Sequence, residues 1–317
     1  GDIIGEGASE EHAVLGETPN LAARFQALAE PGTVVVGEAT RRLAEGLFVF
    51  DDLGPQRLKG VAAPVTAYRL REATEAQNRF EAAAQSRLTP LVGRGEEIGL
   101  MLGRWEQAKE GEGQVVLLSA EPGLGKSRIT KDLRDRLETE PHHRVLCFCS
   151  PFYKNSAFHP IIQQLRSRFG FERDDTDETK LEKIDADLRL LGLPVEEHAP
   201  VLAALLTIPM GNRYKPLGLN AEQLKRAVLD TLVARTEARA ADQPMLLIVE
   251  DLHWMDPSTL EFVGHVIERI GSSRVMLVLT FRPEFVSPWG RHSHLTELSL
   301  NRLGRKESLR IIGELTG

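Results

Sequence analysis

Three uninterrupted apolar runs in the second half of the chain predict strands that are buried on both faces of one sheet. They cover residues 115–118, 245–249 and 275–279 and consist of Val, Leu, Ile and Met. Continuous apolar runs of this length are typical of parallel sheets, because helices cover both faces. Residues 145–149 and 295–300 add two further predicted strands.

Apolar residues spaced three or four apart predict helices between these strands. Ile129, Leu133 and Leu137 follow the first strand in this way. Further helices are expected over residues 96–109, 160–169, 219–240 and from 305 onward, and Gly and Pro break the helices within 173–216. Asp256 is expected to be the N-cap of a helix that has Pro257 at its first position. Residues 90–317 therefore read as an α/β domain with a doubly wound, mainly parallel sheet and a helical insertion.

The first 70 residues alternate short strands and helices and predict a small α+β unit. Strands are expected over residues 12–15, 33–36, 48–52 and 65–70, with a short helix at 40–44. A longer helix follows Asn20 and places Leu21, Phe25 and Leu28 on its core face. Residues 71–89 are rich in alanine and charge and are expected to be a partly helical linker. The predicted domains are thus 1–70 and 90–317, joined by 71–89.

Composition narrows the class of protein. The 317 residues carry a formal charge of −7, which argues against nucleic-acid binding by bulk electrostatics. Cys147 and Cys149 share one face of a predicted strand and are expected to be reduced core thiols, as in a cytosolic protein. No signal peptide or membrane-length apolar run is present, so a cytoplasmic protein without membrane contact is expected. Because the chain begins and ends in mid-pattern, it is expected to be a piece of a longer polypeptide.

The turn after the first apolar run has the pattern of a phosphate-binding loop. Residues 115–129 read as strand, glycine-rich turn, Lys-Ser and helix, which is the context that this motif requires. Backbone N–H groups of the turn and of the helix start converge on phosphate oxygens. Ala120 stands where the motif usually has its first glycine, and the substitution is expected to leave the site intact. The residues predicted to hold the nucleotide here are Ala120, Gly123, Leu124, Gly125, Lys126, Ser127 and Arg128.

Acidic and basic residues at the ends of two other strands complete the predicted site for ATP and Mg²⁺. Glu250 is expected to hold the Mg²⁺ shell together with Ser127, either directly or through water. Asp251 is expected to polarise the attacking water. Arg282 ends the third strand and would point into the crevice where open α/β sheets bind ligands, so it is predicted to contact the γ-phosphate. The nine histidines show no metal-binding spacing, and His253 is expected to pack.

The order of these motifs resembles that of STAND-type, AAA-like signal-transduction ATPases. A Leu-Val-Gly-Arg box at 91–94 precedes the phosphate-binding loop, Glu-Asp-Leu-His-Trp-Met-Asp-Pro-Ser spans 250–258, and Leu-Thr-Phe-Arg-Pro spans 279–283. The resemblance implies that Arg94 lies near the adenine and ribose. It also implies a switch with slow turnover, because no arginine supplied by a partner is identifiable.

The first 70 residues resemble the C-terminal half of class III nucleotide cyclase catalytic domains. The resemblance rests on residues 16–24, on Pro31-Gly32 and on Leu58-Lys59-Gly60. It implies that Asn20 orients the ribose, Arg24 stabilises the transferring phosphate and Lys59 contacts the triphosphate. The family's metal-binding aspartates lie in the first half of that domain, outside this sequence, and Ala13 stands where many members contact adenine. This chain is therefore not expected to cyclise ATP by itself.

Together the two resemblances suggest an architecture like that of soluble adenylyl cyclase. The ATPase module would control a fused cyclase that makes a cyclic nucleotide, with cAMP as the expected product and a homodimer formed through the complete cyclase domain. Two alternatives remain open at this point. The nucleotide could be a sensed ligand that is not turned over, or the cyclase half could be a degenerate scaffold that only dimerises.

Overall fold

The chain separates into two compact units, Gly1–Thr89 and Pro90–Gly317. The computed structural model describes residues 2–4, 13–15, 17–61, 63–74 and 90–316. Most of the predicted linker, residues 75–89, lies outside the described residues. Its first residues were assigned wrongly, because residues 71–73 continue a strand of the first unit.

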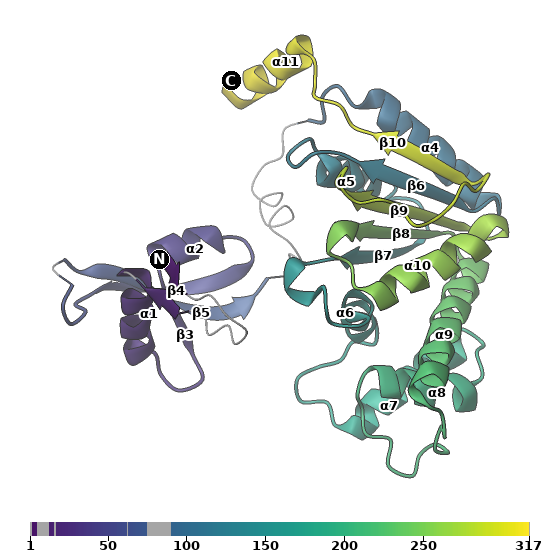
Figure 1. Ribbon diagram of the computed structural model, residues 1–317, viewed down its shortest axis with the longest axis horizontal. Helices are drawn as coiled ribbons and strands as arrows, with labels where there is room; N and C mark the ends of the chain where they lie inside the picture. Colours follow the sequence, from purple (N-terminus) through teal and green to yellow (C-terminus); the bar gives the residue numbers. More distant parts are fainter. Residues whose placement is uncertain (1, 5–12, 16, 62, 75–89, 317) are drawn as a thin grey trace. The chain divides into compact units, whose positions relative to one another are not determined.

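The described residues of the first unit form two small antiparallel sheets and two helices. In chain order its elements are β1 (Asp2–Ile4), β2 (Ala13–Leu15), α1 (Glu17–Leu28), β3 (Val34–Gly37), α2 (Glu38–Leu43), β4 (Phe48–Gln56) and β5 (Val65–Ala73). β1 pairs with β2, and the other strands form a three-stranded sheet in the order β3-β5-β4 (Figure 1). The predicted strands and helices are therefore present, although β4 and β5 run past their predicted ends.

The core of the first unit is small. Phe25 of α1 packs with Leu58 and Ala67, and all three are buried. Leu28 was expected on the same core face but is 37% exposed. The prediction was wrong for Leu28, which is the last residue of α1 and lies at an exposed helix end.

The second unit is built on a five-stranded parallel sheet. Its strands are β6 (Gln114–Ser119), β7 (His143–Phe148), β8 (Met245–Glu250), β9 (Val275–Phe281) and β10 (Leu295–Ser299). They lie in the order β10-β6-β9-β8-β7, and every pairing is parallel (Figure 1). The predicted α/β fold with a parallel sheet is confirmed.

Helices bury both faces of this sheet. The helices of the second unit are α4 (Gly95–Lys109), α5 (Lys126–Arg136), α6 (His159–Arg168), α7 (Asp177–Leu190), α8 (Val195–Leu205), α9 (Ala221–Asp242), α10 (Pro257–Arg269) and α11 (Arg305–Thr316), of which α7 and α8 pack with each other and α8 with α9. Alternate strand residues point to opposite faces. Val116, Leu246 and Val278 pack with α4 and α5, whereas Leu247 and Leu277 pack with α6 to α10. The uninterrupted apolar runs of the sequence follow from this double burial.

The predicted N-cap of α10 also anchors a distant loop. Asp256 is 1% exposed, and its carboxylate accepts hydrogen bonds from the backbone N–H groups of Ser258 and Thr259. It accepts a third from the N–H of Phe158, at 3.0 Å. The cap therefore fixes the start of α10 and the approach to α6 together.

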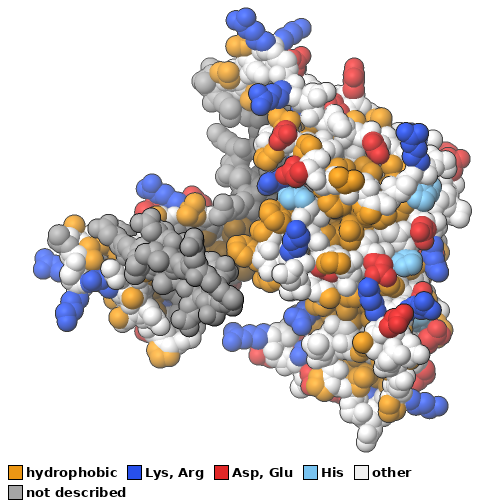
Figure 2. Space-filling view, in the orientation of Figure 1, with side chains coloured by type: hydrophobic (Ala, Val, Ile, Leu, Met, Phe, Trp, Pro, Cys, Tyr) orange, Lys and Arg blue, Asp and Glu red, His pale blue; other side chains and the backbone are white. Residues whose placement is uncertain are grey.

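Three further observations concern the chemistry of the described residues. Cys147 and Cys149 are free and buried on the same face of the sheet, as expected from their spacing. No described helix combines the length and apolar character needed to cross a membrane. Acidic and basic side chains alternate over the face of the second unit seen in Figure 2.

Candidate nucleotide site

The loop between β6 and α5 has the backbone shape that a phosphate-binding loop requires. Gly123 and Gly125 have φ angles of 79° and 97°, in the left-handed region that glycine enters without steric cost. Gly125 is the N-cap of α5, so the unbonded N–H groups of the first helical turn open onto the loop. Ala120 lies outside the left-handed region and is buried in the core, which explains why a methyl group is tolerated there.

Lys126 is drawn into this loop. Its ammonium donates hydrogen bonds to the carbonyl oxygens of Ala120, at 2.7 Å, and Glu121, at 3.4 Å. Burial lowers the pKa of Lys126, the charge of Asp251 opposes that effect, and the charge of Arg282 adds to it. The structure therefore brings Lys126, Asp251 and Arg282 close enough for their charges to act on one another.

Glu250 joins strand β8 to helix α5. Its side chain is 5% exposed and accepts one hydrogen bond from the Ser127 hydroxyl, at 2.7 Å, and one from the Thr130 hydroxyl, at 2.6 Å. Burial raises the pKa of Glu250, and the two hydroxyl donors act against this rise by stabilising the carboxylate. Ser127 and Glu250, the two residues predicted to hold Mg²⁺, are thus in direct contact, and Thr130 is a further partner of Glu250.

The oxygens of Ser127 and Glu250 suit Mg²⁺. This ion prefers oxygen ligands and is commonly held by one or two protein groups, with phosphate oxygens and water filling the remaining positions. Ser127 Oγ and Glu250 Oε2 lie 2.7 Å apart and supply such groups beside the phosphate-binding loop. Among the residues that the structure describes, no group of three or more His, Cys, Asp or Glu could hold a metal ion. A metal here would therefore depend on the nucleotide for further ligands.

Asp251 adopts an unusual backbone conformation. Its φ of 62° is in the left-handed region, which costs about 1–3 kcal/mol for a residue other than glycine and occurs often at functional sites. The Asp251 N–H donates to the hydroxyl of Thr280 on the neighbouring strand β9, at 3.1 Å. The left-handed conformation turns the chain just after Glu250, and this bond ties the turn to β9.

Arg282 follows β9 directly. Its guanidinium carbon lies 5.9 Å from the ring centroid of Trp254, and one of its nitrogens is 4.0 Å from the carboxylate of Glu284. The side chain is 36% exposed. β6, β9 and β8 are adjacent and parallel, so the phosphate-binding loop, Arg282 and the Glu250-Asp251 pair all follow the carboxyl ends of neighbouring strands.

Arg94 holds the edge of the loop. Its buried guanidinium donates to the carbonyl oxygens of Leu124, at 3.3 Å, and Asn301, at 2.6 Å. It also pairs with Glu97 at 2.9 Å. These bonds tie the start of α4 and the chain after β10 to the phosphate-binding loop. The predicted contact of Arg94 with adenine or ribose stays a prediction, as does that of the half-buried Arg128 with phosphate.

Two residues of this region were not predicted as functional. Thr130 lies one helical turn after Ser127 on α5, and that spacing was the available signal. His253 was expected to pack, but the charges of Asp251, Arg282 and Lys126 also act on its pKa. Burial lowers the pKa of His253, and its two ring nitrogens have no hydrogen-bond partner among the described residues.

The three residues predicted from the cyclase resemblance lie in the first unit. Asn20 and Arg24 are one turn apart on α1, and Lys59 is exposed in the turn after β4. The guanidinium of Arg24 lies beside that turn, because a Cβ atom built on Gly60 would be 3.0 Å from Arg24 Nη1. The structure therefore brings Arg24 next to the Lys59-Gly60 pair.

Comparison with known proteins identifies the second unit. The family described as AAA ATPase domain matches residues 90–278. An uncharacterized protein of Rhizobium meliloti (strain 1021) is 29% identical over 313 residues, which are 96% of this chain and 30% of that protein. The chain therefore spans less than a third of the length of this relative. The family match does not extend to residues 1–70, where the cyclase resemblance lies.

Solved structures resemble the chain only distantly. Drosophila ORC bound to DNA has a TM-score of 0.41 and 14% identity, covering 70% of this chain and 46% of that chain. VirB4 of Thermoanaerobacter pseudethanolicus has a TM-score of 0.28 and 16% identity, covering 64% of this chain and 81% of that chain. Likenesses at this level support no assignment of function.

The burial of Glu250 predicts a pH-dependent effect of removing its charge. A carboxyl group whose pKa is raised in the folded chain favours folding at low pH, and that advantage is lost as the pH rises above the ordinary value of 4.5. Glu250→Gln should therefore increase the free energy of unfolding at pH 7 and have less effect below pH 4.5. Urea unfolding followed by tryptophan fluorescence measures this, since all three tryptophans lie in the second unit.

Glu138→Gln, at an exposed position of the same unit, is the matched control and should show little change between the two pH values. A Glu250→Gln effect that is the same at both pH values would contradict the interpretation.

Proposed function

The chain belongs to the AAA ATPase domain family, and on that basis we propose that residues 90–317 bind ATP with Mg²⁺ and hydrolyse it slowly as a signalling switch. The observation that carries this proposal is the junction between the phosphate-binding loop and Glu250. Lys126 lies against the loop, and the hydroxyl of Ser127 is bonded to the carboxylate at the end of β8. A triphosphate seated on the N–H groups of the loop would meet both.

Each residue has a distinct task in the proposed reaction. Lys126 leaves the loop carbonyls to bind the β- and γ-phosphates. Arg282 neutralises charge on the γ-phosphate as its bond to the leaving oxygen breaks. Asp251 orients a water for in-line attack and accepts its proton. Ser127 and Glu250 would hold Mg²⁺, which supplies neutralisation of phosphate charge when bound.

The arrangement also favours slow turnover. In this proposal Lys126 and Arg282 are the two cations assigned to the γ-phosphate, and no further arginine is assigned to it; Arg94 bonds to loop carbonyls instead. Phosphoryl transfer gains about 10³–10⁵ in rate from an added arginine, in cis or in trans. A slow intrinsic rate suits a switch whose nucleotide state persists long enough to be read.

Nucleotide binding should depend on Lys126. We expect Lys126→Ala to weaken ATP affinity by roughly a hundredfold, since a charge-assisted phosphate contact in a buried loop contributes about 1.5–3 kcal/mol. Equilibrium binding of radiolabelled ATP in the presence of Mg²⁺ measures this. Lys131→Ala, which removes an ammonium paired with Asp135 on the same helix, should bind like the unaltered chain. Unchanged affinity in Lys126→Ala would refute the site.

A second candidate function is nucleotide sensing without turnover. It is favoured by Ala120, which replaces the first glycine of the loop, and by Glu250, which replaces the more usual aspartate and is already bonded to two hydroxyls. In this case the bound nucleotide would stabilise one conformation and would not be consumed.

Phosphate release separates the two functions. If the switch hydrolyses ATP, Asp251→Asn should lower the rate by roughly a hundredfold or more, with ATP affinity nearly unchanged, because the amide cannot accept the proton of the water. Glu268→Gln, which alters an exposed carboxylate of α10, is the control and should release phosphate like the unaltered chain. Release at the background rate in both the unaltered chain and Asp251→Asn, with intact ATP binding, would support the sensor instead.

We further propose that residues 1–70 belong to a class III cyclase domain that makes a cyclic nucleotide, with cAMP as the expected product, under control of the ATPase module. The position of the Arg24 guanidinium beside Gly60 supports this, because it places a positive charge next to the turn that contains Lys59, as the binding of a triphosphate would require. The proposal concerns the longer protein, acting as a homodimer through its complete cyclase domain.

The cyclase proposal predicts a selective loss in the longer protein. Arg24→Ala should lower cyclic nucleotide formation by roughly a hundredfold or more, because a positive charge facing the transferring phosphate is removed. Arg42→Ala, an exposed arginine paired with Glu38 on α2, is the control. Formation of cyclic nucleotide at equal rates in the two variants would exclude the assigned role, and its absence from the unaltered protein would point to a scaffold.

A further inference from the structure

A pocket lies on the face of the sheet opposite α4 and α5. Strands β7 and β8 form its floor, and helices α6, α9 and α10 form its walls. Its volume is about 50 Å³, which is room for roughly four water-sized groups. The sequence patterns gave no indication of it, and it shares no lining residue with the nucleotide site.

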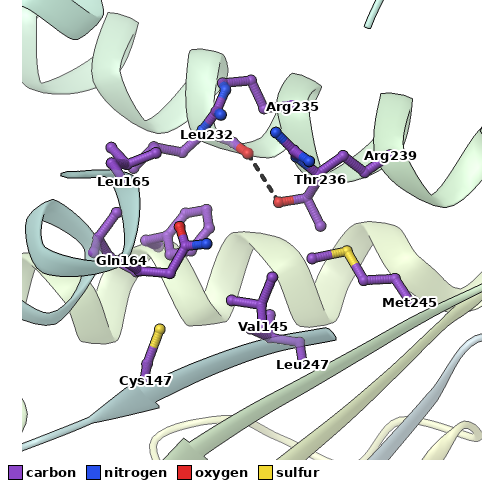
Figure 3. Close-up of a pocket in the computed structure, with 12 residues that line it drawn as sticks. Val145, Cys147, Gln164, Leu165, Leu232, Arg235, Thr236, Arg239, Met245 and Leu247 are labelled. Atoms are coloured by element: carbon purple, nitrogen blue, oxygen red, sulfur yellow. Dashed lines mark hydrogen bonds between the residues drawn. The ribbon is translucent and has the colours of Figure 1, made fainter. Parts of the chain in front are cut away.

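The two ends of the pocket differ in chemistry. Val145, Cys147 and Leu247 present an apolar floor, whereas Arg235 and Arg239 lie above it on α9 (Figure 3). Gln164 of α6 extends its amide toward the space between them (Figure 3). An apolar chamber with a few convergent polar groups is the usual form of a small-molecule site.

The charges at the polar end do not balance. The side chains of Arg235 and Arg239 are 6% and 7% exposed, and both pair with the single carboxylate of Asp187. Arg168 adds a third positive charge, 3.9 Å from the same carboxylate. Buried charges are normally matched, because an uncompensated one costs several kcal/mol by order of magnitude. The cluster therefore has an excess of positive charge against the wall of the pocket.

One donor at this end is unused. The Nε of Arg235 is buried and has no hydrogen-bond partner among the described residues. The ring of Phe169 covers one side of the guanidinium, with its centroid 5.0 Å from the guanidinium carbon. The Thr236 hydroxyl donates to the carbonyl of Leu232, at 2.9 Å (Figure 3), and the structure shows no hydrogen bond from Arg235 Nε to it. Buried donors are rarely left without a partner.

We propose that this pocket binds a short-chain carboxylate of about two or three carbons. The carboxylate would accept hydrogen bonds from Arg235 and the amide of Gln164 and offset the excess positive charge. The short alkyl group would lie on Val145, Cys147 and Leu247. The size follows from the volume of about 50 Å³, because acetate has only four non-hydrogen atoms.

The site is distinct from the nucleotide site but shares a strand with it. Leu247 lines the pocket, and Glu250 ends the same strand three residues later. Carboxylate binding is nevertheless measured without nucleotide. Its failure would leave the proposed ATPase function untouched, and the failure of ATP binding would leave this pocket untouched.

The experiment uses acetate as the probe and the whole 317-residue chain. Saturation-transfer NMR of the acetate methyl signal, titrated at constant ionic strength, should show saturable binding. Acetamide has the same shape but no charge, so it cannot balance the charge of the arginines. Its affinity should be lower than that of acetate by roughly tenfold or more. Propionate should compete with acetate.

Two neighbouring substitutions on α6 localise the binding. Gln164→Glu places a carboxylate in the pocket and should weaken acetate binding by roughly tenfold or more, through competition for Arg235 and charge repulsion. Gln163→Glu makes the same change at the adjacent exposed position and should bind acetate like the unaltered chain. Both replace partly or fully exposed side chains and should leave the fold intact, as checked by tryptophan fluorescence.

Three results would overturn the proposal: no saturable acetate signal, equal binding of acetamide and acetate, or equal binding by the Gln164→Glu and Gln163→Glu chains.

Discussion

The bond between Glu250 and the two hydroxyls of α5 is the interaction on which the nucleotide site depends. A carboxylate buried at the end of β8 would be costly alone, because burial disfavours its charged form. Ser127 and Thr130 reduce that cost, and they also fix the rotation of α5 about its axis. Lys126 and the loop before it are thereby held over the carboxyl ends of the central strands.

The cost of burying charged groups and straining the backbone is also what suits this site to a ligand. Lys126 is partly desolvated and rests on carbonyl oxygens, Glu250 is buried, and Asp251 has a strained backbone. Each of these features lowers the stability of the chain without nucleotide. A triphosphate with its metal supplies the opposite charges that these groups lack, so binding would relieve costs already present in the fold.

The helical insertion also buries charge that is only partly compensated, and there the excess charge is positive. Arg235 and Arg239 are buried against one aspartate, and their surplus charge faces a pocket. Burial lowers the pKa of both arginines and Asp187 counters this effect, which is the pattern of a cation that is only partly compensated. The nucleotide loop and this pocket thus lie on separate parts of the second unit. Each has buried positive charge that a different anion would neutralise, a triphosphate at the loop and a short carboxylate in the pocket.

Local sequence determined the elements and the order in which they occur. Uninterrupted apolar runs predicted the three central strands of the parallel sheet, the glycine-rich turn predicted the phosphate-binding loop, and Asp256 with Pro257 predicted a helix start. These features depend on neighbours within a few residues, so the sequence alone is enough to predict them.

Only the tertiary structure could show that Thr130 bonds to Glu250, 120 residues away, or that Arg94 donates hydrogen bonds to the carbonyls of Leu124 and Asn301. The tertiary structure also determines that Leu28 is exposed. In α9, whose apolar spacing predicted a buried face, it places two buried arginines beside a pocket. Periodicity fixes which face of an element turns inward, but the partner that meets each side chain is set by how distant segments pack.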